Sequence, residues 1–343
     1  MIIIKVLKAH KGDCIFLSYG KEKNYNILID GGEGKAGYRQ LNSQIDKLKL
    51  MNEKIDLLVL THFDSDHIAG IIRLFSKGDF DYSIVKKIWF NFGTKLDNYL
   101  QIKSKLKDIC LEDNSSKISW RQGKKLEEKL YDEGIEYEII TKLYTCSIND
   151  STITVLSPSK EVLKRLADEG LEEKNIKSSE ISSKNDYIYS MEDLLQRNEK
   201  SDISLSNKSS IAFLFSFNSY SILFLADSDP QEIIDSLKKL GYSKENRLKI
   251  DFCKISHHAS KHNTSNELIQ IIDCKNYIIS TQMTSQGRPS KECLTRIICN
   301  SKKELNFYCN YEINWNTIFT KEEFDTYKMK FYCISEEGII LER

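Results

Sequence analysis

The residues of this chain that are best suited to chemistry lie in one short run, His62-Phe63-Asp64-Ser65-Asp66-His67. The run follows residues 56–60, which are apolar enough to form a buried strand. A surface loop has no structural need for two imidazoles and two carboxylates at such close spacing. Where a strand turns into a helix, alternate side chains can point into one pocket and hold two ions about 3.5–4 Å apart. The run therefore predicts a metal centre at a strand end.

The histidines of the chain indicate a site shared by two distant segments. Only six occur, and three of them, His257, His258 and His262, follow a second strand-like segment at residues 252–255. Taken alone, His257 and His258 are ambiguous, since one could cap a helix while the other faces solvent. Beside the first cluster, we expect at least one of them to bind metal or take part in catalysis. We expect His262 to be a surface residue.

Two further carboxylates follow apolar strands. Asp30 precedes two glycines, which permit a tight turn with positive φ, and we expect it to orient a ligand histidine by a hydrogen bond. Asp227 follows the wholly apolar residues 222–226. The helix that begins near Pro230 can be capped by another residue, which leaves Asp227 free to bridge two ions.

The elements that must position these residues follow an alternating pattern in two similar halves. Strands are expected at residues 2–7, 13–19, 25–30, 55–61, 87–92, 151–156, 210–217, 220–226, 250–255, 276–281, 304–311 and 331–334. Helices are expected at residues 43–49, 68–75, 96–109, 122–132, 230–240, 265–272 and 290–298. This alternation predicts a layered α/β domain. Residues 169–206 are rich in Ser, Lys, Glu and Asn, and they predict an inserted polar loop that is either a lid over the site or a plain tether.

The composition limits the classes of protein to which the chain can belong. The 343 residues carry 50 basic and 50 acidic side chains, so the net charge is zero and long-range steering toward nucleic acid is not indicated. The start of the chain predicts a first strand and no secretory signal, and no apolar run is long enough to cross a membrane. The nine cysteines contain no CxxC pair, and Cys14, Cys253 and Cys333 lie in apolar runs. We therefore expect reduced cysteines in the core of a cytoplasmic protein.

Several segments occur in a specific serial order: HKGDCIFLSYG, ILIDGG, LLVLTHFDSDHIAG, ITVLSP, SNKSSIAFLF, ILFLADSDP, KISHHASKHNTS and GRPSKECLTRI. In this order they resemble the metallo-β-lactamase fold, and more closely the branch that contains the nuclease-like domain of bacterial competence (DNA-uptake) proteins. The family pattern HxHxDH appears here as HxDxDH, which is similar to the competence branch. The resemblance implies a single domain over residues 1–343, built as a four-layer αββα sandwich with metal at one edge of its two sheets.

The chain departs from the family pattern at two positions. The family usually has a further ligand histidine before the bridging carboxylate, but no histidine lies between His67 and His257. The residues that lie near the place of that ligand are Asp202, Asn207 and Ser209. Where the branch usually has Gly-His-Pro, this chain has Arg288. A guanidinium offers no lone pair to a metal, but it can hold a phosphate through two hydrogen bonds.

The resemblance also implies the residues of the site. The metal ligands for one or two divalent ions would be His62, Asp64, Asp66, His67, Asp227, His257 and His258, with Asp13 and Asp30 beside them. Zn²⁺ or Mn²⁺ is expected, and Mg²⁺ is compatible with the carboxylates. The ion would lower the pKa of its water, Asp66 would orient or deprotonate that water, and Arg288 would stabilise the charge that develops on oxygen.

These features together favour a metal-dependent hydrolase, with a phosphodiesterase or nuclease acting on nucleic acid or a nucleotide as the first hypothesis. Hydrolysis of a lactone, amide or thioester is the second, since the fold accommodates all of them. A metal-poor sensor or partner-binding module is the third, and the two missing histidines support it. A modestly basic region is more typical of a solvated face than of a nucleic-acid site; it contains Lys86, Lys87, Lys95, Lys103, Lys105 and Lys107. The substrate and the oligomeric state stay open.

Overall fold

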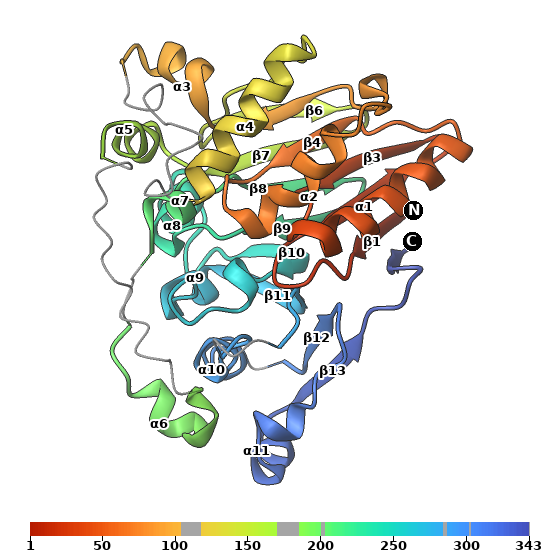
Figure 1. The fold of residues 1–343 in the computed structure, drawn as a ribbon. Coiled ribbons are helices and arrows are strands. Elements are labelled where there is room, and N and C mark those ends of the chain that lie inside the picture. Colours follow the sequence, from red (N-terminus) through yellow and green to blue (C-terminus); the bar gives the residue numbers. More distant parts are fainter. Residues whose placement is uncertain (104–117, 170–184, 200–202, 284–286, 302, 343) are drawn as a thin grey trace.

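The computed structural model describes residues 1–103, 118–169, 185–199, 203–283, 287–301 and 303–342. These residues form two β-sheets that face each other, with helices on the outer side of each sheet (Figure 1). The predicted four-layer αββα sandwich is therefore confirmed.

The first sheet has six strands in the order β14-β1-β2-β3-β4-β5. Its strands are β1 (Ile2–Val6), β2 (Ile15–Gly20), β3 (Asn24–Ile29), β4 (Leu57–Leu60), β5 (Ile88–Phe90) and β14 (Ile339–Leu341). Strands β3, β4 and β5 are parallel, so their carboxyl ends lie at one edge of the sheet.

The second sheet has eight strands in the order β13-β12-β11-β10-β9-β8-β7-β6. Its strands are β6 (Thr145–Ile148), β7 (Ser151–Ser157), β8 (Ala212–Phe217), β9 (Tyr220–Phe224), β10 (Leu248–Lys254), β11 (Ile272–Ile279), β12 (Leu305–Cys309) and β13 (Met329–Cys333). The five strands from β9 to β13 run parallel to one another.

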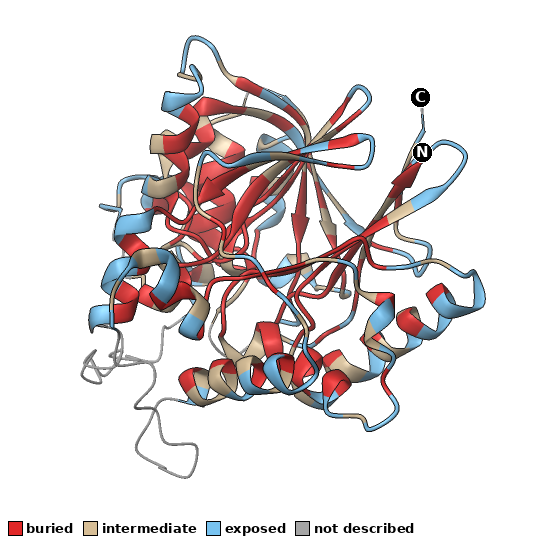
Figure 2. Ribbon diagram, turned by 90° about the horizontal axis from the view of Figure 1, so that it is seen from above, coloured by how far each residue is buried: buried red, intermediate tan, exposed pale blue. Residues whose placement is uncertain are grey.

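Alternation of side chains along the strands explains the layers. Along β4, Leu57 and Val59 pack between the two sheets, whereas Leu58 and Leu60 pack against the helices of the first sheet. Successive side chains of a strand point to opposite faces, so a strand that is apolar at every position must be covered on both sides. Figure 2 shows the result, with buried residues along the strands and exposed residues on the outer faces of the helices.

Two groups of helices cover the outer faces of the sheets. The first sheet is covered by α1 (Gly34–Leu50), α2 (Ser65–Phe75), α3 (Gly93–Leu100), α4 (Ile118–Asp132) and α5 (Lys160–Glu169). The second sheet is covered by α6 (Met191–Leu195), α8 (Pro230–Lys239), α9 (Asn266–Ile271) and α10 (Lys291–Cys299). Two short helices, α7 (Leu205–Lys208) and α11 (Lys321–Thr326), complete the set in the described residues.

Some expectations about the elements were wrong. The helix expected over residues 96–109 ends at Leu100, because Gln101 adopts a left-handed conformation with φ of 57°; residues 104–109 lie outside the described part. Helix α5 was missed, although Leu163 and Leu166 have helical spacing and are buried. Cys14 and Cys253 are buried as expected, but Cys333 is exposed because it ends β13, the edge strand of its sheet.

The described part of the inserted segment packs against the second helix layer. Asp186 is buried and accepts hydrogen bonds from the side chain of Ser290 at 2.6 Å and from the backbone N–H groups of Lys291 and Glu292. These groups belong to the first turn of α10. The contact fastens the insert to the end of that helix, and its role as a lid or a tether stays a prediction. Among the described residues, no helix combines the length and the apolar character that crossing a membrane requires.

Candidate metal centre

The predicted site residues follow the carboxyl ends of strands in both sheets. Asp30 follows β3, the run 62–67 follows β4, Asp227 follows β9, and the pair His257-His258 follows β10. Parallel strands bring such ends to one edge of a sheet, which is where α/β proteins commonly bind ligands. The sandwich places these edges of the two sheets face to face, so residues far apart in the sequence meet in one cluster.

The backbone is strained around this cluster. Asp30, Ala226, His257, His258 and Ala259 have positive φ values of 56°, 45°, 48°, 57° and 64° although none of them is a glycine. Each such residue costs on the order of 1–3 kcal/mol, and such strain gathers at functional sites. Three of these residues, Asp30, His257 and His258, supply side chains to the cluster.

Gly12 allows another loop to approach the site. A Cβ atom at this position would lie 1.5 Å from the backbone oxygen of Asp66. Only glycine therefore permits the loop before β2 to pack against the start of α2. The close approach brings the neighbouring Asp13 beside the centre.

Asp30 holds the first histidine cluster in place from behind. Its carboxylate accepts hydrogen bonds from the backbone N–H of Thr61 at 2.8 Å and from the Thr61 hydroxyl at 2.6 Å. Its Oδ2 also lies 2.7 Å from Nδ1 of His67, which donates to it. Because the Thr61 hydroxyl donates to Asp30, its oxygen is an acceptor for Nδ1–H of His62, 3.1 Å away. In the neutral imidazoles, the Nε2 atoms of both histidines therefore keep the lone pair.

The second histidine cluster is fixed in the same way. Nδ1 of His258 lies 2.7 Å from the backbone carbonyl of Ser280, which can only accept. Nδ1 of His257 lies 2.8 Å from Oδ1 of Asn263, whose amide nitrogen donates to the backbone oxygen of Asp227. Both Nδ1 atoms therefore carry the proton, and both Nε2 atoms keep a lone pair.

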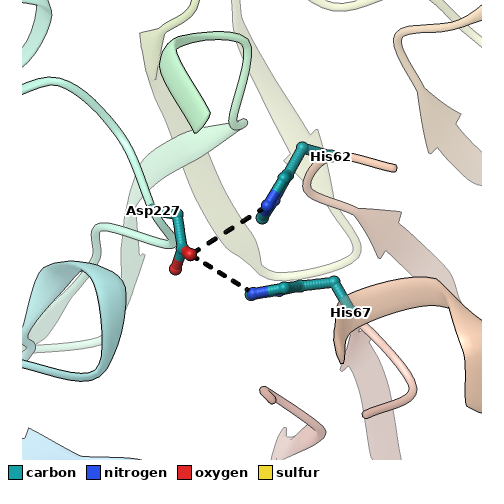
Figure 3. Close-up of side chains that lie close together, drawn as sticks. All are labelled: His62, His67 and Asp227. Carbon is teal, nitrogen blue, oxygen red and sulfur yellow. Dashed lines mark ion pairs between the residues drawn. The ribbon is translucent and has the colours of Figure 1, made fainter. Parts of the chain in front are cut away.

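The four Nε2 atoms converge on one carboxylate oxygen, Oδ2 of Asp227. The distances are 4.0 Å from His62, 3.5 Å from His67, 3.4 Å from His257 and 4.0 Å from His258. Figure 3 shows His62 and His67 pointing toward Asp227 from the opposite sheet. Most of these separations are too long for a hydrogen bond, but metal ligands surround an ion at comparable spacing.

Two more carboxylates border the cluster. Oδ2 of Asp66 lies 3.6 Å from Nε2 of His258, and Oδ2 of Asp64 lies 3.6 Å from Nε2 of His62. Asp64 also accepts a hydrogen bond of 2.7 Å from Ser206, a residue that the sequence did not single out. The side chain of Asp66 is 29% exposed, whereas that of Asp227 is 2% exposed. Asp66 is thus a carboxylate of the cluster that water or a substrate can reach.

The donor set fits a divalent metal ion. Nε2 of His62, His67 and His258 and Oδ1 of Asp227 are buried without a hydrogen-bond partner among the described residues. Buried polar atoms without partners are rare in folded proteins, and a metal ion is one group that satisfies them. Side chains able to share an ion include the group His62, His67 and Asp227 and the group Asp66, His67 and His258.

Electrostatic interactions shift the pKa values within the cluster. Burial raises the pKa of Asp227, but the neighbouring charges of His257 and His67 outweigh burial and hold that pKa well below its usual range. Burial lowers the pKa of His67, but Asp227 and Asp30 outweigh it and raise that pKa well above its usual value. Burial lowers the pKa of His257 to about 4, with a further contribution from Arg288.

The remaining predicted residues have different surroundings. Burial lowers the pKa of Arg288, and the nearby charge of Asp227 partly offsets this effect. Oδ1 of Asn207 is buried without a partner among the described residues, so it is available near the place of the missing histidine. The hydroxyl of Ser209 instead donates to the backbone oxygen of Ser206. Asp202 lies outside the described residues.

Asp13 is buried beside the centre and pairs with a lysine that sequence reasoning missed. Its Oδ2 accepts a hydrogen bond from Lys254, the last residue of β10, and both side chains are almost fully buried. Its Oδ1 lies 3.6 Å from Nδ1 of His258. A lysine inside the apolar segment 252–255 was a signal that a buried acid would face it.

Metal affinity should rise with pH. In the metal-free protein the raised pKa of His67 extends the protonated form of this imidazole to higher pH than in an ordinary histidine. Its protonation stabilises the metal-free fold fully below the ordinary histidine pKa of about 6.5, and this contribution is lost as pH rises through the raised value. An ion that binds Nε2 must displace the proton, so the apparent affinity should increase over the same interval. Calorimetry of Zn²⁺ binding in buffers of different ionisation enthalpy measures the released protons, and an affinity independent of pH would contradict this expectation.

The chain belongs to the metallo-β-lactamase superfamily. The family model described as "Metallo-beta-lactamase superfamily" matches residues 9–282, which is most of the chain. This superfamily consists mostly of metal-dependent hydrolases that bind divalent ions, and the His/Asp clusters described above agree with that property. The expected superfamily is therefore confirmed, whereas the competence-like branch stays a prediction.

Solved structures of similar fold include YhfI from Bacillus subtilis, a metallo-β-lactamase fold protein that is 13% identical, with 100% of both chains covered and a TM-score of 0.45. CmlA from Streptomyces venezuelae, a diiron β-hydroxylase, is 14% identical over 87% of this chain and 49% of its own, with a TM-score of 0.40. Tm1679, a metal-dependent hydrolase of the β-lactamase superfamily, is 9% identical over 81% of this chain and 87% of its own, with a TM-score of 0.39. These likenesses concern the fold alone. No curated protein matches the chain closely enough to count as a relative.

Proposed function

We propose that this chain hydrolyses phosphodiester bonds with a metal-activated water, and that its substrate is a nucleic acid or a nucleotide. The observation that carries the proposal is the set of four Nε2 atoms that converge on Oδ2 of Asp227. Arg288 adds a cation near the same carboxylate, and a guanidinium can hold two phosphate oxygens at once. The order of motifs, which resembles the nuclease-like domain of competence proteins, favours the same substrate class.

Two sets of donors that meet at Asp227 would hold the ions. His62 and Asp64 form one set with Asp227, while Asp66, His67 and His258 form the other. Sets that contain imidazole suit Zn²⁺ or Mn²⁺ better than Mg²⁺, which prefers oxygen ligands alone. A bound ion would supply Lewis acidity, which lowers the pKa of a coordinated water and polarises a phosphoryl oxygen.

The side chains around the ions have separate tasks. Burial raises the pKa of Asp66, but the charges of His67 and His258 outweigh burial and lower that pKa, so its carboxylate stays ionised and can orient a water or accept its proton. Arg288 would face the phosphate and balance the negative charge that develops on its oxygens. Asp30 keeps His67 oriented through the hydrogen bond at Nδ1.

The basic region noted in the sequence adds no support for nucleic-acid binding. Lys86, Lys87 and Lys95 each form an ion pair with a carboxylate of a neighbouring segment, so their charges are balanced locally. Lys105 and Lys107 lie outside the described residues.

Replacing Asp66 by alanine tests the proposed chemistry. We expect turnover to fall by about 10²–10⁴-fold, the usual contribution of a positioned base, while the fold survives because the side chain is partly exposed. The assay is hydrolysis of bis(p-nitrophenyl) phosphate, single-stranded DNA and RNA by metal-loaded protein, with circular dichroism to confirm folding. Full activity of Asp66→Ala would remove this residue from the mechanism.

A lactone in the same panel separates the proposal from its main rival. Hydrolysis of the lactone without hydrolysis of any phosphodiester would overturn the proposed substrate class and leave a metallohydrolase. Elemental analysis of protein purified without chelator separates both from a binding module, which would contain no stoichiometric metal.

A further inference from the structure

A groove follows the outer face of α2 from Ser65, the first residue of the helix, toward its end. It encloses a cavity of about 710 Å³ and is bordered by residues of α1, α2 and α4, among them Tyr38, Ser65, Arg73, Lys77 and Lys125. We call it the α2 groove. It lies outside the two donor sets, and neither the donor sets nor the roles proposed above use its side chains.

The spacing of residues along α2 explains the groove. Ser65, Ala69, Ile72 and Arg73 border it at intervals of four, three and one, which places them on one face of the helix. Helix α2 lies between α1 and α4 (Figure 1) and packs against both. Residues of all three helices line the groove.

One end of the α2 groove lies at the start of α2. Ser65 stands between Asp64 and Asp66 in the sequence, and its hydroxyl accepts a hydrogen bond of 3.2 Å from Gln122 of α4. Two helical turns, about 12 Å, separate Ser65 from Arg73. A ligand that extended beyond Ser65 would approach the segment that carries Asp64 and Asp66.

The charge of the α2 groove is positive, although the whole chain has a net charge of zero. Arg73, Lys77 and Lys125 border it, and Glu33 is its one acidic residue among the described lining. Glu33 lies 3.0 Å from His10. Lys77 donates to Asn42 and is influenced by the charges of Asp46 and Asp79, so the positive charge of the groove comes mainly from Arg73 and Lys125. The cations thus leave the groove with a net charge that a polyanion would balance.

The dimensions and the lining suit a single nucleic-acid strand. A cavity of about 710 Å³ holds a few nucleotides but not a duplex. Tyr38 supplies an aromatic ring, and Ser65 and Gln122 supply polar groups beside the cations. Proteins that bind single strands combine a basic groove with aromatic rings in this way.

We propose that the α2 groove binds the phosphate backbone of a single-stranded nucleic acid and guides it toward the metal centre. Hydrolysis of the bound strand rests on the proposed function, whereas binding of the strand in the groove does not. Arg73 and Lys125 would contact phosphates, while Tyr38 would lie beside a base.

The test is the affinity of the full-length chain for a fluorescein-labelled single-stranded oligonucleotide, measured by anisotropy in EDTA so that hydrolysis cannot interfere. The double variant Arg73→Ala/Lys125→Ala should bind about tenfold more weakly at low salt, and the slope of log K against log salt should fall by about 1.4 for two lost contacts. A matched control, Lys239→Ala/Lys244→Ala, removes the same charge from exposed positions near the end of α8 and should bind like the parent chain.

The outcomes separate this inference from the proposed function. Equal binding by the groove variant and the control would overturn the groove, whatever the chain hydrolyses. Loss of binding in the groove variant alone would support it, even if no phosphodiester were cleaved. A polyglutamate peptide that bound as tightly as the oligonucleotide, with the same dependence on Arg73 and Lys125, would overturn the assignment to nucleic acid.

Discussion

Replacing Asp227 by alanine should abolish metal binding and metal-dependent hydrolysis together. Four Nε2 atoms lie within 4.0 Å of its Oδ2, so this carboxylate is the group that both donor sets share. Loss of an outer hydrogen-bond partner typically lowers metal affinity by about 10–100-fold, and loss of the shared ligand should exceed that. Elemental analysis after dialysis and the rate of phosphodiester hydrolysis are the two measurements.

The fold of Asp227→Ala should survive, because the backbone oxygen of Asp227, and not its side chain, accepts the hydrogen bond from Asn263. Asp229 provides a matched control two residues away. It caps α8 by accepting from the backbone N–H of Gln231, so Asp229→Ala should cost about 1 kcal/mol of stability and leave metal binding intact. A variant without Asp227 that kept stoichiometric metal and full activity would refute the shared-ligand role.

Local spacing in the sequence was enough to predict which side chains gather in the His/Asp cluster; their binding of metal stays a prediction. The run 62–67 after an apolar strand, and the carboxylates Asp30 and Asp227 at the ends of two others, follow from the alternation of strand side chains. Thr61 and Asn263 were present within the same motifs, but their function depends on hydrogen bonds that only the folded chain shows. The backbone carbonyl of Ser280 orients His258. Because every residue type has such a carbonyl, the sequence could not have predicted this contact.

The number of nitrogen donors was harder to predict. The sequence indicated that at least one of His257 and His258 would bind metal or take part in catalysis, and it did not decide between one and both. Both residues have left-handed φ values, and both Nε2 atoms lie within 4.0 Å of Oδ2 of Asp227. The structure therefore brings both imidazoles to the cluster.

The pairing of the buried Lys254 with Asp13 could not be predicted from the sequence either. Lys254 and Asp13 are separated by 241 positions and come from opposite sheets, so only the packing of the sandwich brings them together. Their pairing has the largest consequence for stability that we expect of any single contact near the centre.

Replacing Lys254 by methionine should destabilise the protein by about 3–5 kcal/mol, because it leaves the charge of Asp13 buried without its partner. Methionine has a similar volume, so the loss would arise from charge and not from a cavity. Urea denaturation followed by circular dichroism gives the free energy of unfolding. Burial raises the pKa of Asp13, but Lys254 and His258 outweigh burial and lower it, so its ionised form contributes stability that is lost as pH falls. The deficit of Lys254→Met should accordingly shrink toward acidic pH.

The double variant Asp13→Asn/Lys254→Met distinguishes a buried ion pair from a simple packing contact. Removing both charges eliminates the uncompensated carboxylate, so the double variant should recover much of the stability that Lys254→Met loses. If the two single losses simply added, the residues would be acting independently and the pair would not be the source of the effect.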